Sequence, residues 1–353
     1  MPGTPPFTLF GGASFGEGLF ATTEYDQQLL ALLVTLKVGH IDTAAIYPLR
    51  SQGKSEQLLG ESHADHSFAI DTKIKLADFS GEGSFTASAI NESVAESSSR
   101  IKAKVKSLFC PSIIHHSPQY TYPLDHIRSM YCIATCPMHQ PRSAKRLLLS
   151  MNFISRISSK KLGYPRLPRS QTLANTRYLG ISNFSVAQVQ ERLELCEKEG
   201  YTKPSYYQGQ YNALCREAET QLLPILRQQK ISYIAHRRVL TGIFTLGTDV
   251  TGTRFEYGNP KGVLFKRRYD NEPTHSAMKE SITLLQPYDI TPLEAALRWV
   301  YYHSALQEGD GVILGASKPA QISLNAADIA KGPLPSDVAE AMEKMWTSIQ
   351  AQM

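Results

Sequence analysis

Residues 39–60 read GHIDTAAIYPLRSQGKSEQLLG, and this stretch decides the fold that the sequence predicts. Its opening residues, 39–44, have the pattern of a short buried strand around Ile41. The preceding segment, residues 23–37, has apolar side chains at positions 25, 29, 30, 32, 33 and 36, which is the spacing of one helix face. A helix therefore leads directly into a strand, and the same alternation continues on both sides of this stretch.

Strand-like and helix-like segments alternate along the rest of the chain. Further strands are expected at residues 67–73, 111–116, 177–184, 205–210, 230–236 and 311–315, and helices at 87–102, 222–226 and 336–346. Two more helices are expected after Ser185, where Gln188 completes a capping box, and after Thr291, which precedes Pro292 and Glu294. Seven or eight strand–helix units in about 300 residues favour an α/β fold, a closed (β/α)8 TIM barrel, over an open doubly wound sheet. No Gly-x-Gly-x-x-Gly follows the first of these strands, which argues against a Rossmann domain.

Length and composition indicate a soluble globular protein, which we treat as a single domain over residues 1–353. Hydrophobic residues make up 42% of the chain and charged residues 20%, which excludes a wholly disordered protein. The best apolar stretch, residues 29–36, is too short to span a membrane, and the N-terminal residues lack the features of a secretory signal. Because the five cysteines are few and scattered, we expect a reducing, cytoplasmic location and no membrane partner.

Residues 131–176 interrupt the alternating pattern. Nine Lys and Arg residues and no Asp or Glu lie between positions 131 and 177, so the rest of the chain carries a net charge of −4 although the whole carries +5. Aromatic residues are not interleaved with these basic residues, and we expect no nucleic-acid partner. Cys132 and Cys136, near His126 and His139, fit no common zinc spacing, and we expect no metal. The segment is interpreted as an irregular surface insertion or as translated non-coding sequence that replaces the rest of the fourth helix, and we favour the second interpretation.

Polar side chains stand where three successive expected strands end. Asp42 and Tyr47 follow one strand, Lys73 ends the next, and either His115 or His116 ends the third. Each of these residue types alone is more often structural, as a helix cap, a loop contact, a solvated cation or a buried histidine. In a TIM barrel, however, the catalytic groups lie at these strand ends.

Carbonyl reduction uses this set of side chains. A phenol is a weak acid at neutral pH, and a nearby ammonium group stabilises its anion. A carboxylate can hold that ammonium in place, and a neutral imidazole can direct the substrate oxygen. The coincidence of all four groups at strand ends therefore favours an enzyme that protonates a carbonyl oxygen.

The quoted stretch resembles the signature Asp-Thr-Ala-x-x-Tyr…Gly-x-Ser-Glu-x-x-x-Gly of the aldo-keto reductase superfamily, at residues 42–47 and 53–60. The resemblance covers residues 7–130 and 177–350. It is most similar to the aflatoxin aldehyde reductase-like subgroup, through Arg216, Glu219 and residues 251–255. The match of residues 116–118 to the family's His-x-Pro motif selects the second histidine of the pair. The resemblance implies a TIM barrel that binds NADPH, with the catalytic residues Asp42, Tyr47, Lys73 and His116.

The same resemblance implies where the cofactor binds. Residues 180–184 match a Gly-Ile-Ser-Asn-Phe strand that holds the nicotinamide carboxamide, and residues 315–325 are similar to an adenosine-phosphate site. His236 stands where the family has a tyrosine that stacks on the nicotinamide, and it precedes Arg237 and Arg238, which we expect to turn outward. The residues implied to bind NADPH are Ser182, Asn183, Gln208, His236, Gly315, Ser317, Lys318, Gln321 and Asn325.

These observations together predict an NADPH-dependent oxidoreductase that reduces a small-molecule aldehyde or ketone, with Tyr47 as the proton donor. The reaction is expected in specialised-metabolite biosynthesis or detoxification. Potassium-channel β subunits share this barrel, so a catalytically weak binding subunit is an alternative. A barrel disabled by the altered fourth helix is a third hypothesis, and a homo-oligomer is compatible with the sequence.

Overall fold

The barrel predicted from the sequence is confirmed. The computed structural model describes residues 4–75, 87–103, 105–111, 178–199, 203–236, 271–316 and 318–351. Eight strands close into a barrel in the order of the sequence, and all neighbouring strands that pair are parallel, including the first and the last. The strands are β1 (Phe7–Gly11), β2 (His40–Asp42), β3 (Ala69–Lys73), β4 (Ser107–Pro111), β5 (Tyr178–Ser182), β6 (Tyr206–Gln210), β7 (Ser232–His236) and β8 (Gly311–Leu314).

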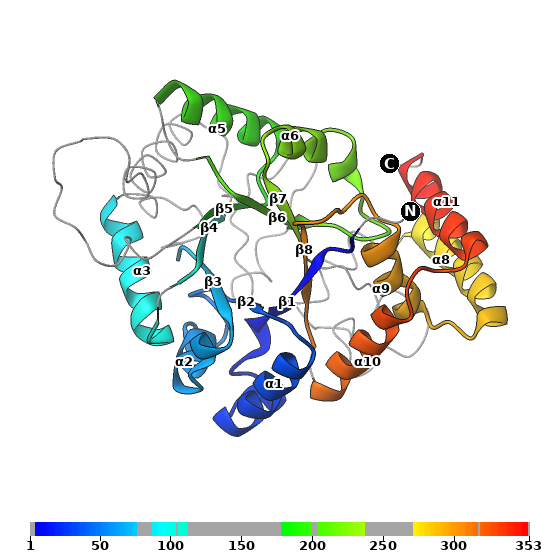
Figure 1. Cartoon of the computed structure of the whole chain (residues 1–353). Coiled ribbons are helices and arrows are strands. Elements are labelled where there is room, and N and C mark those ends of the chain that lie inside the picture. Colours follow the sequence, from blue (N-terminus) through cyan, green and yellow to red (C-terminus); the bar gives the residue numbers. More distant parts are fainter. Residues whose placement is uncertain are drawn as a thin grey trace, which may run out of the picture.

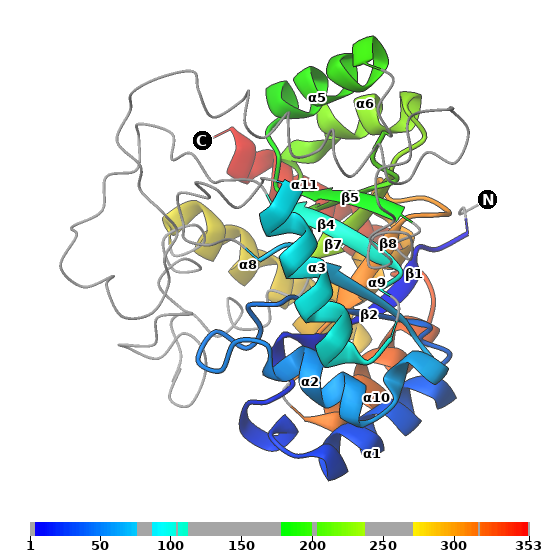
Figure 2. The same ribbon diagram turned by 90° about the vertical axis from the view of Figure 1, so that its left-hand side faces the viewer.

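Helices surround the barrel on its outside (Figure 1). The α-helices of the described residues are α1 (Thr23–Thr35), α2 (Lys54–Glu61), α3 (Ala87–Ile101), α5 (Val186–Glu199), α6 (Leu222–Gln228), α8 (Glu272–Leu285), α9 (Pro292–Tyr302), α10 (Pro319–Ala330) and α11 (Ser336–Gln350). Figure 2 shows α5 and α6 together on one side of the barrel, with α1, α2 and α10 on the opposite side. None of the helices in these ranges has both the length and the apolar character needed to cross a membrane.

Two of the predicted helix starts are confirmed by their cap geometry. The Ser185 hydroxyl accepts a hydrogen bond from the Gln188 N–H at 3.3 Å, and the Gln188 side chain accepts one from the Ser185 N–H at 2.8 Å. The Thr291 hydroxyl accepts a bond from the Glu294 N–H at 3.1 Å, immediately before Pro292. Short polar side chains thus satisfy N–H groups that the first turn of a helix leaves unpaired.

The sequence misplaced the start of one strand and missed one strand and three helices. The fourth strand occupies residues 107–111, so it begins four residues earlier than the predicted segment 111–116. The first strand, β1, and the helices α2, α8 and α10 were not predicted. Residues 112–116 and the irregular segment 131–176 lie outside the described residues, so the two interpretations of that segment stay predictions.

Alternate residues of each strand face the helices or the inside of the barrel. On β2 and β3, Ile41 and Ile70 are buried with Leu29 and Leu33 of α1 in the layer between strands and helices. The inside of the barrel holds a small apolar cluster of Leu9, Ile234 and Ile313. Most interior positions on β2 and β3 are polar, namely His40, Asp42, Asp71 and Lys73, so charged side chains lie inside the barrel.

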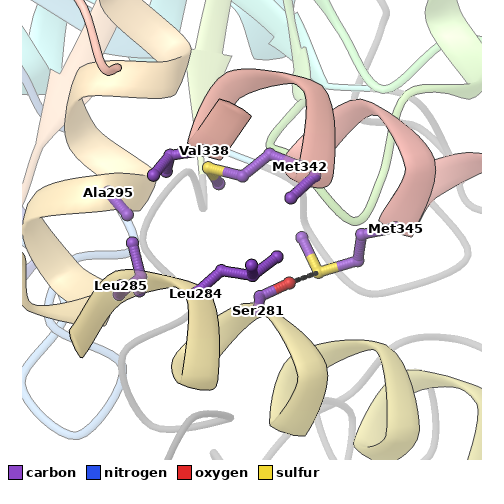
Figure 3. A pocket seen from close by; sticks show the side chains of 8 residues that line it. Ser281, Leu284, Leu285, Ala295, Val338, Met342 and Met345 are labelled. Carbon is purple, nitrogen blue, oxygen red and sulfur yellow. Dashed lines mark hydrogen bonds between the residues drawn. The ribbon is translucent and has the colours of Figure 1, made fainter. Parts of the chain in front are cut away.

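A small apolar cavity lies in the helix layer between α8, α9 and α11 (Figure 3). Its volume is about 10 Å³, which is room for roughly one water molecule. The Ser281 hydroxyl donates to the Met345 sulfur across it at 3.4 Å. Because it is small, apolar and outside the barrel, this cavity is a packing defect between helices, and the functional site is sought at the strand ends.

Candidate active site

An ion pair between β2 and β3 forms the centre of the candidate site. The Lys73 Nζ lies 2.6 Å from the Asp42 Oδ1 and donates a second hydrogen bond to the Thr43 carbonyl oxygen at 2.9 Å. The Lys73 side chain is 11% exposed and that of Asp42 is 7% exposed. Both residues stand at the C-terminal ends of paired strands, so the regular barrel geometry holds the two charges together.

The surroundings of this pair keep the lysine charged. Burial alone lowers the pKa of Lys73, but the Asp42 carboxylate and its hydrogen bond outweigh that effect, and the pKa of Lys73 lies above its ordinary value. Burial raises the pKa of the Asp42 carboxyl, while the contacts with Lys73 and Gln208 oppose the rise. The structure therefore places an ammonium group, shielded from solvent, at the end of β3.

Tyr47 lies against this ammonium group. The Lys73 Nζ is 5.3 Å from the centroid of the Tyr47 ring. The loop after β2 fixes the tyrosine by backbone hydrogen bonds, from the Tyr47 N–H to the Ala44 oxygen at 2.9 Å and from the Ser55 N–H to the Tyr47 oxygen at 3.1 Å. The half-buried phenol is thus held beside the cation.

The Gly-x-Ser-Glu-x-x-x-Gly stretch supports the ends of these strands from α2. The Ser55 hydroxyl donates to the Gly12 carbonyl at 2.8 Å. The Glu56 side chain is fully buried and accepts bonds from the Thr72 hydroxyl at 2.7 Å and from the Arg100 guanidinium at 2.9 Å. Since Thr72 directly precedes the lysine, Glu56 anchors the strand that carries it. The sequence did not predict the part played by Arg100, which comes from α3.

The second glycine of that stretch is required by close packing of helices. A Cβ atom on Gly60 would lie 2.1 Å from the Arg100 carbonyl oxygen and 2.8 Å from the Ile101 carbonyl carbon. Real Cβ atoms do not approach backbone atoms so closely. The glycine therefore allows α2 and α3 to pack at the distance that the contact between Glu56 and Arg100 needs.

The predicted carboxamide ligands gather at the ends of β5, β6 and β7. Asn183 has a left-handed backbone, with φ 59°, which asparagine tolerates better than most residues. Its side chain donates to the Ser182 hydroxyl at 3.1 Å, and its oxygen lies 3.0 Å from the His236 Nε2. The Gln208 amide donates to the Asp42 Oδ1 at 2.8 Å, so this group joins the ion pair.

The predicted phosphate-binding residues lie around the end of β8 and the start of α10. The Lys318 N–H donates to the Gln321 side chain at 3.3 Å, and the Gln321 N–H donates to the Lys318 carbonyl oxygen at 3.1 Å, so the two residues form the first turn of α10. Among the described residues, a Cβ atom on Gly315 would meet no atom within 4 Å. The Asn325 side chain is 5% exposed, and its Oδ1 has no hydrogen-bond partner among the described residues. A buried acceptor on α10, together with the N–H groups at the N-terminus of this helix, is compatible with a bound nucleotide.

Several predicted residues lie outside the described part of the chain. These are His116, Ser317, Arg237 and Arg238, and their roles stay predictions. The structure adds a buried carboxylate, Asp71, which the sequence analysis treated only as part of a strand. The available signal was a charged residue two positions before the lysine, because residues two apart on a strand share a face.

The strand ends of this TIM barrel bring a tyrosine, an ion-paired lysine and two amide side chains together, at the end of the barrel where enzymes of this fold have their active sites. Comparison with known proteins agrees. The chain belongs to the aldo/keto reductase family, whose sequence model matches residues 9–347. Family membership supports oxidoreductase chemistry on a carbonyl group.

Individual relatives are similar over different lengths. An aldo-keto reductase of Pseudocercospora fijiensis is 37% identical over 179 residues, which cover 48% of this chain and 60% of the relative. The oxidoreductase sirO of Leptosphaeria maculans is 28% identical over 98% of this chain and 95% of its own length. Aflatoxin B1 aldehyde reductase member 2 of Rattus norvegicus is 34% identical over 48% of this chain and 50% of its own length. The resemblance to the aflatoxin aldehyde reductase subgroup is therefore confirmed.

Proposed function

We propose that this protein is an NADPH-dependent reductase that converts an aldehyde or a ketone into an alcohol. The observation that carries the proposal is the buried ion pair of Lys73 and Asp42 beside the ring of Tyr47. A tyrosine next to a persistent ammonium group is suited to give up its proton, because the cation stabilises the phenolate that remains. Nothing in a purely structural role requires these three groups to meet at the strand ends.

In the proposed mechanism, the Tyr47 hydroxyl donates its proton to the carbonyl oxygen of the substrate. The Lys73 ammonium stabilises the developing phenolate, and Asp42 holds the lysine in position through the 2.6 Å contact. The nicotinamide cofactor, when bound, supplies the hydride that the carbonyl carbon accepts. His116 is assigned to orient the carbonyl oxygen because it matches the family motif.

The residues at the strand ends fit the cofactor. Ser182, Asn183 and Gln208 offer amide and hydroxyl groups suited to a carboxamide, and His236 offers a flat ring next to them. Towards the adenosine end, the proposed ligands are the groups around the first turn of α10, namely Gly315, Ser317, Lys318, Gln321 and Asn325. A buried amide oxygen with no partner in the described residues supports this assignment.

The preference for NADPH over NADH rests on charge. Lys318 is exposed at the N-terminus of α10, where backbone N–H groups also favour an anion, and no acidic residue stands among the proposed phosphate ligands. Fluorescence titration should show tighter binding of NADPH, and Lys318→Met should weaken NADPH binding but not NADH binding. Lys344→Met, which removes an exposed lysine from α11, is the matched control. Equal affinities of the unmodified protein for the two cofactors would contradict this preference.

The proposed substrates are small aldehydes or ketones of specialised metabolism or detoxification. The names of the rat relative, an aldehyde reductase, and of the oxidoreductase sirO support this class. The first test is loss of NADPH absorbance when the purified protein is mixed with a generic aldehyde such as 4-nitrobenzaldehyde. Turnover that needs both the aldehyde and the cofactor supports the proposal. Binding of NADPH without turnover of any aldehyde or ketone would instead favour a binding subunit or a disabled barrel.

A further inference from the structure

A second carboxylate lies inside the barrel beneath the proposed catalytic pair. Asp71 is two residues before Lys73 on β3, so both side chains face the barrel interior. In the register of the two strands, Asp71 is paired directly with Asp42 of β2. Facing positions on neighbouring strands lie about 5 Å apart. Two carboxylates and one ammonium group therefore share a small volume inside the barrel.

Asp71 is poorly compensated in this position. It is 4% exposed, and its Oδ1 has no hydrogen-bond partner among the described residues. Its Oδ2 lies 3.6 Å from the Nδ1 of His40, a distance beyond a normal hydrogen bond. A buried carboxylate with an unsatisfied oxygen lowers the stability of a fold unless nearby charges compensate it. Such a residue inside a barrel calls for a reason other than packing.

The groups that face Asp71 show what it can do. They are His40 and Asp42 from β2, Lys73 from its own strand, Ser107 from β4 and Tyr206 from β6. Lys73 is the side chain of this set that its surroundings hold in the positively charged form. The negative charge of Asp71 raises the pKa of Lys73, in addition to the larger effect of Asp42. It also contributes to the raised pKa of Asp42 and of Tyr206.

We propose that Asp71 is a positioning residue of the active site, whose carboxylate acts with Asp42 to hold Lys73 in its charged form beside Tyr47. This inference rests on the proposed reductase function. The Asp42 carboxylate is in direct contact with the Lys73 ammonium group. The Asp71 carboxylate adds negative charge from a position two residues earlier on β3. The arrangement extends the pH range over which the lysine can assist the tyrosine, because two carboxylates oppose loss of the lysine proton.

The test compares the pH profile of kcat/KM for the unmodified enzyme and for Asp71→Asn, which keeps the shape and removes the charge. Without that charge the pair of Lys73 and Tyr47 loses a proton at lower pH, so the basic limb of the profile moves to lower pH. We expect a loss of about tenfold on that limb, which corresponds to about 1.4 kcal/mol, and little change at neutral pH. Ser107→Ala is the matched control, since Ser107 is paired with Asp71 in register on the other side of β3 and carries no charge.

A second measurement does not depend on activity. Titration of the Lys73 side chain by carbon-13 NMR should give a lower pKa in Asp71→Asn than in the unmodified protein, and no change in Ser107→Ala. If Asp71→Asn does not fold, Asp71→Ser provides the same loss of charge with a smaller side chain. An unchanged pKa of Lys73 in a folded variant would overturn the inference, as would an unmoved basic limb. If the lysine pKa falls but no carbonyl compound is reduced, the proposed function fails while the electrostatic part played by Asp71 stands.

Discussion

Asp42→Asn isolates the effect of the ion pair on stability. The substitution keeps the size of the side chain but removes the carboxylate that lies 2.6 Å from the Lys73 Nζ. The Thr43 carbonyl remains as an acceptor for the lysine at 2.9 Å, but it carries no net charge. Removing one partner of a buried ion pair typically costs 3–5 kcal/mol, because the other charge is left buried and uncompensated. We expect a loss of about 3 kcal/mol at pH 7, at the lower end because one acceptor remains.

The pH dependence of this loss has a definite sign. In the unmodified protein the pKa of Lys73 is raised above its value in the unfolded chain, which is about 10.4. The charged lysine therefore stabilises the fold fully at pH values below about 10.4. This stabilisation is lost as pH rises through the pKa of Lys73 in the folded protein. In the variant the Asp71 carboxylate remains, but without the direct contact to Asp42 the effect of burial is larger and lowers the lysine pKa. Folding is therefore penalised most at neutral pH. That penalty disappears as pH approaches about 10.4, where the unfolded lysine also loses its proton. The difference in the free energy of unfolding between the unmodified protein and Asp42→Asn should therefore become smaller as pH rises.

Urea unfolding, followed by the fluorescence of the buried Trp299 and Trp346, measures this difference at pH 7 and at a higher pH. Asp310→Asn is the matched control, because Asp310 is also a buried carboxylate and pairs with Arg227 at the opposite end of the barrel. The control should lose stability but keep its turnover per folded molecule, whereas Asp42→Asn should lose both. A destabilisation below about 1 kcal/mol at pH 7, or one that does not narrow with pH, would refute the reasoning.

Two further predictions concern stability. Gly60→Ala should destabilise the protein by about 2–3 kcal/mol in urea unfolding, because the new Cβ would lie 2.1 Å from the Arg100 oxygen. Gly39→Ala is the control and should cost much less, since no atom of the described residues lies within 4 Å of its new Cβ. Equal losses of stability in the two variants would contradict the packing argument. Asp26 is buried, and neither of its carboxylate oxygens has a hydrogen-bond partner among the described residues. Burial raises the pKa of this carboxyl group to about 7. Its ionisation in the folded protein therefore lowers the free energy of unfolding as pH rises from about 4 to about 7. Asp26→Asn should therefore stabilise the protein by about 2 kcal/mol at pH 8 and by little at pH 4, and a gain independent of pH would refute this explanation.

The fold could be predicted from the sequence because alternation of strand and helix patterns is a local signal. The caps at Ser185 and Thr291 show how much short stretches specify. The exceptions have physical reasons. The strand β1 has no helix before it to mark its start, and the apolar run after Pro111 has the same local pattern as the strand that β4 forms upstream of it.

The candidate site could be predicted only where its residues stand at strand ends. Asp42, Tyr47 and Lys73 were found in this way, and the structure brings all three together. Asp71 and Arg100 were missed because their importance depends on strand register and on how closely two helices pack. These are properties of the assembled barrel. The spacing of Asp71 and Lys73 indicates that the two residues share a face of their strand, but it does not show which groups of the neighbouring strands they meet.

The most direct test of the proposed function is Tyr47→Phe, assayed for reduction of 4-nitrobenzaldehyde and for binding of NADPH. The change removes the hydroxyl that donates the proton but keeps the ring beside Lys73. General acid catalysis contributes about 10²–10⁴-fold, so turnover should fall by at least about a hundredfold while the NADPH affinity stays nearly unchanged. A folded Tyr47→Phe protein that retains more than roughly a tenth of the original turnover would contradict the assignment of Tyr47 as the proton donor.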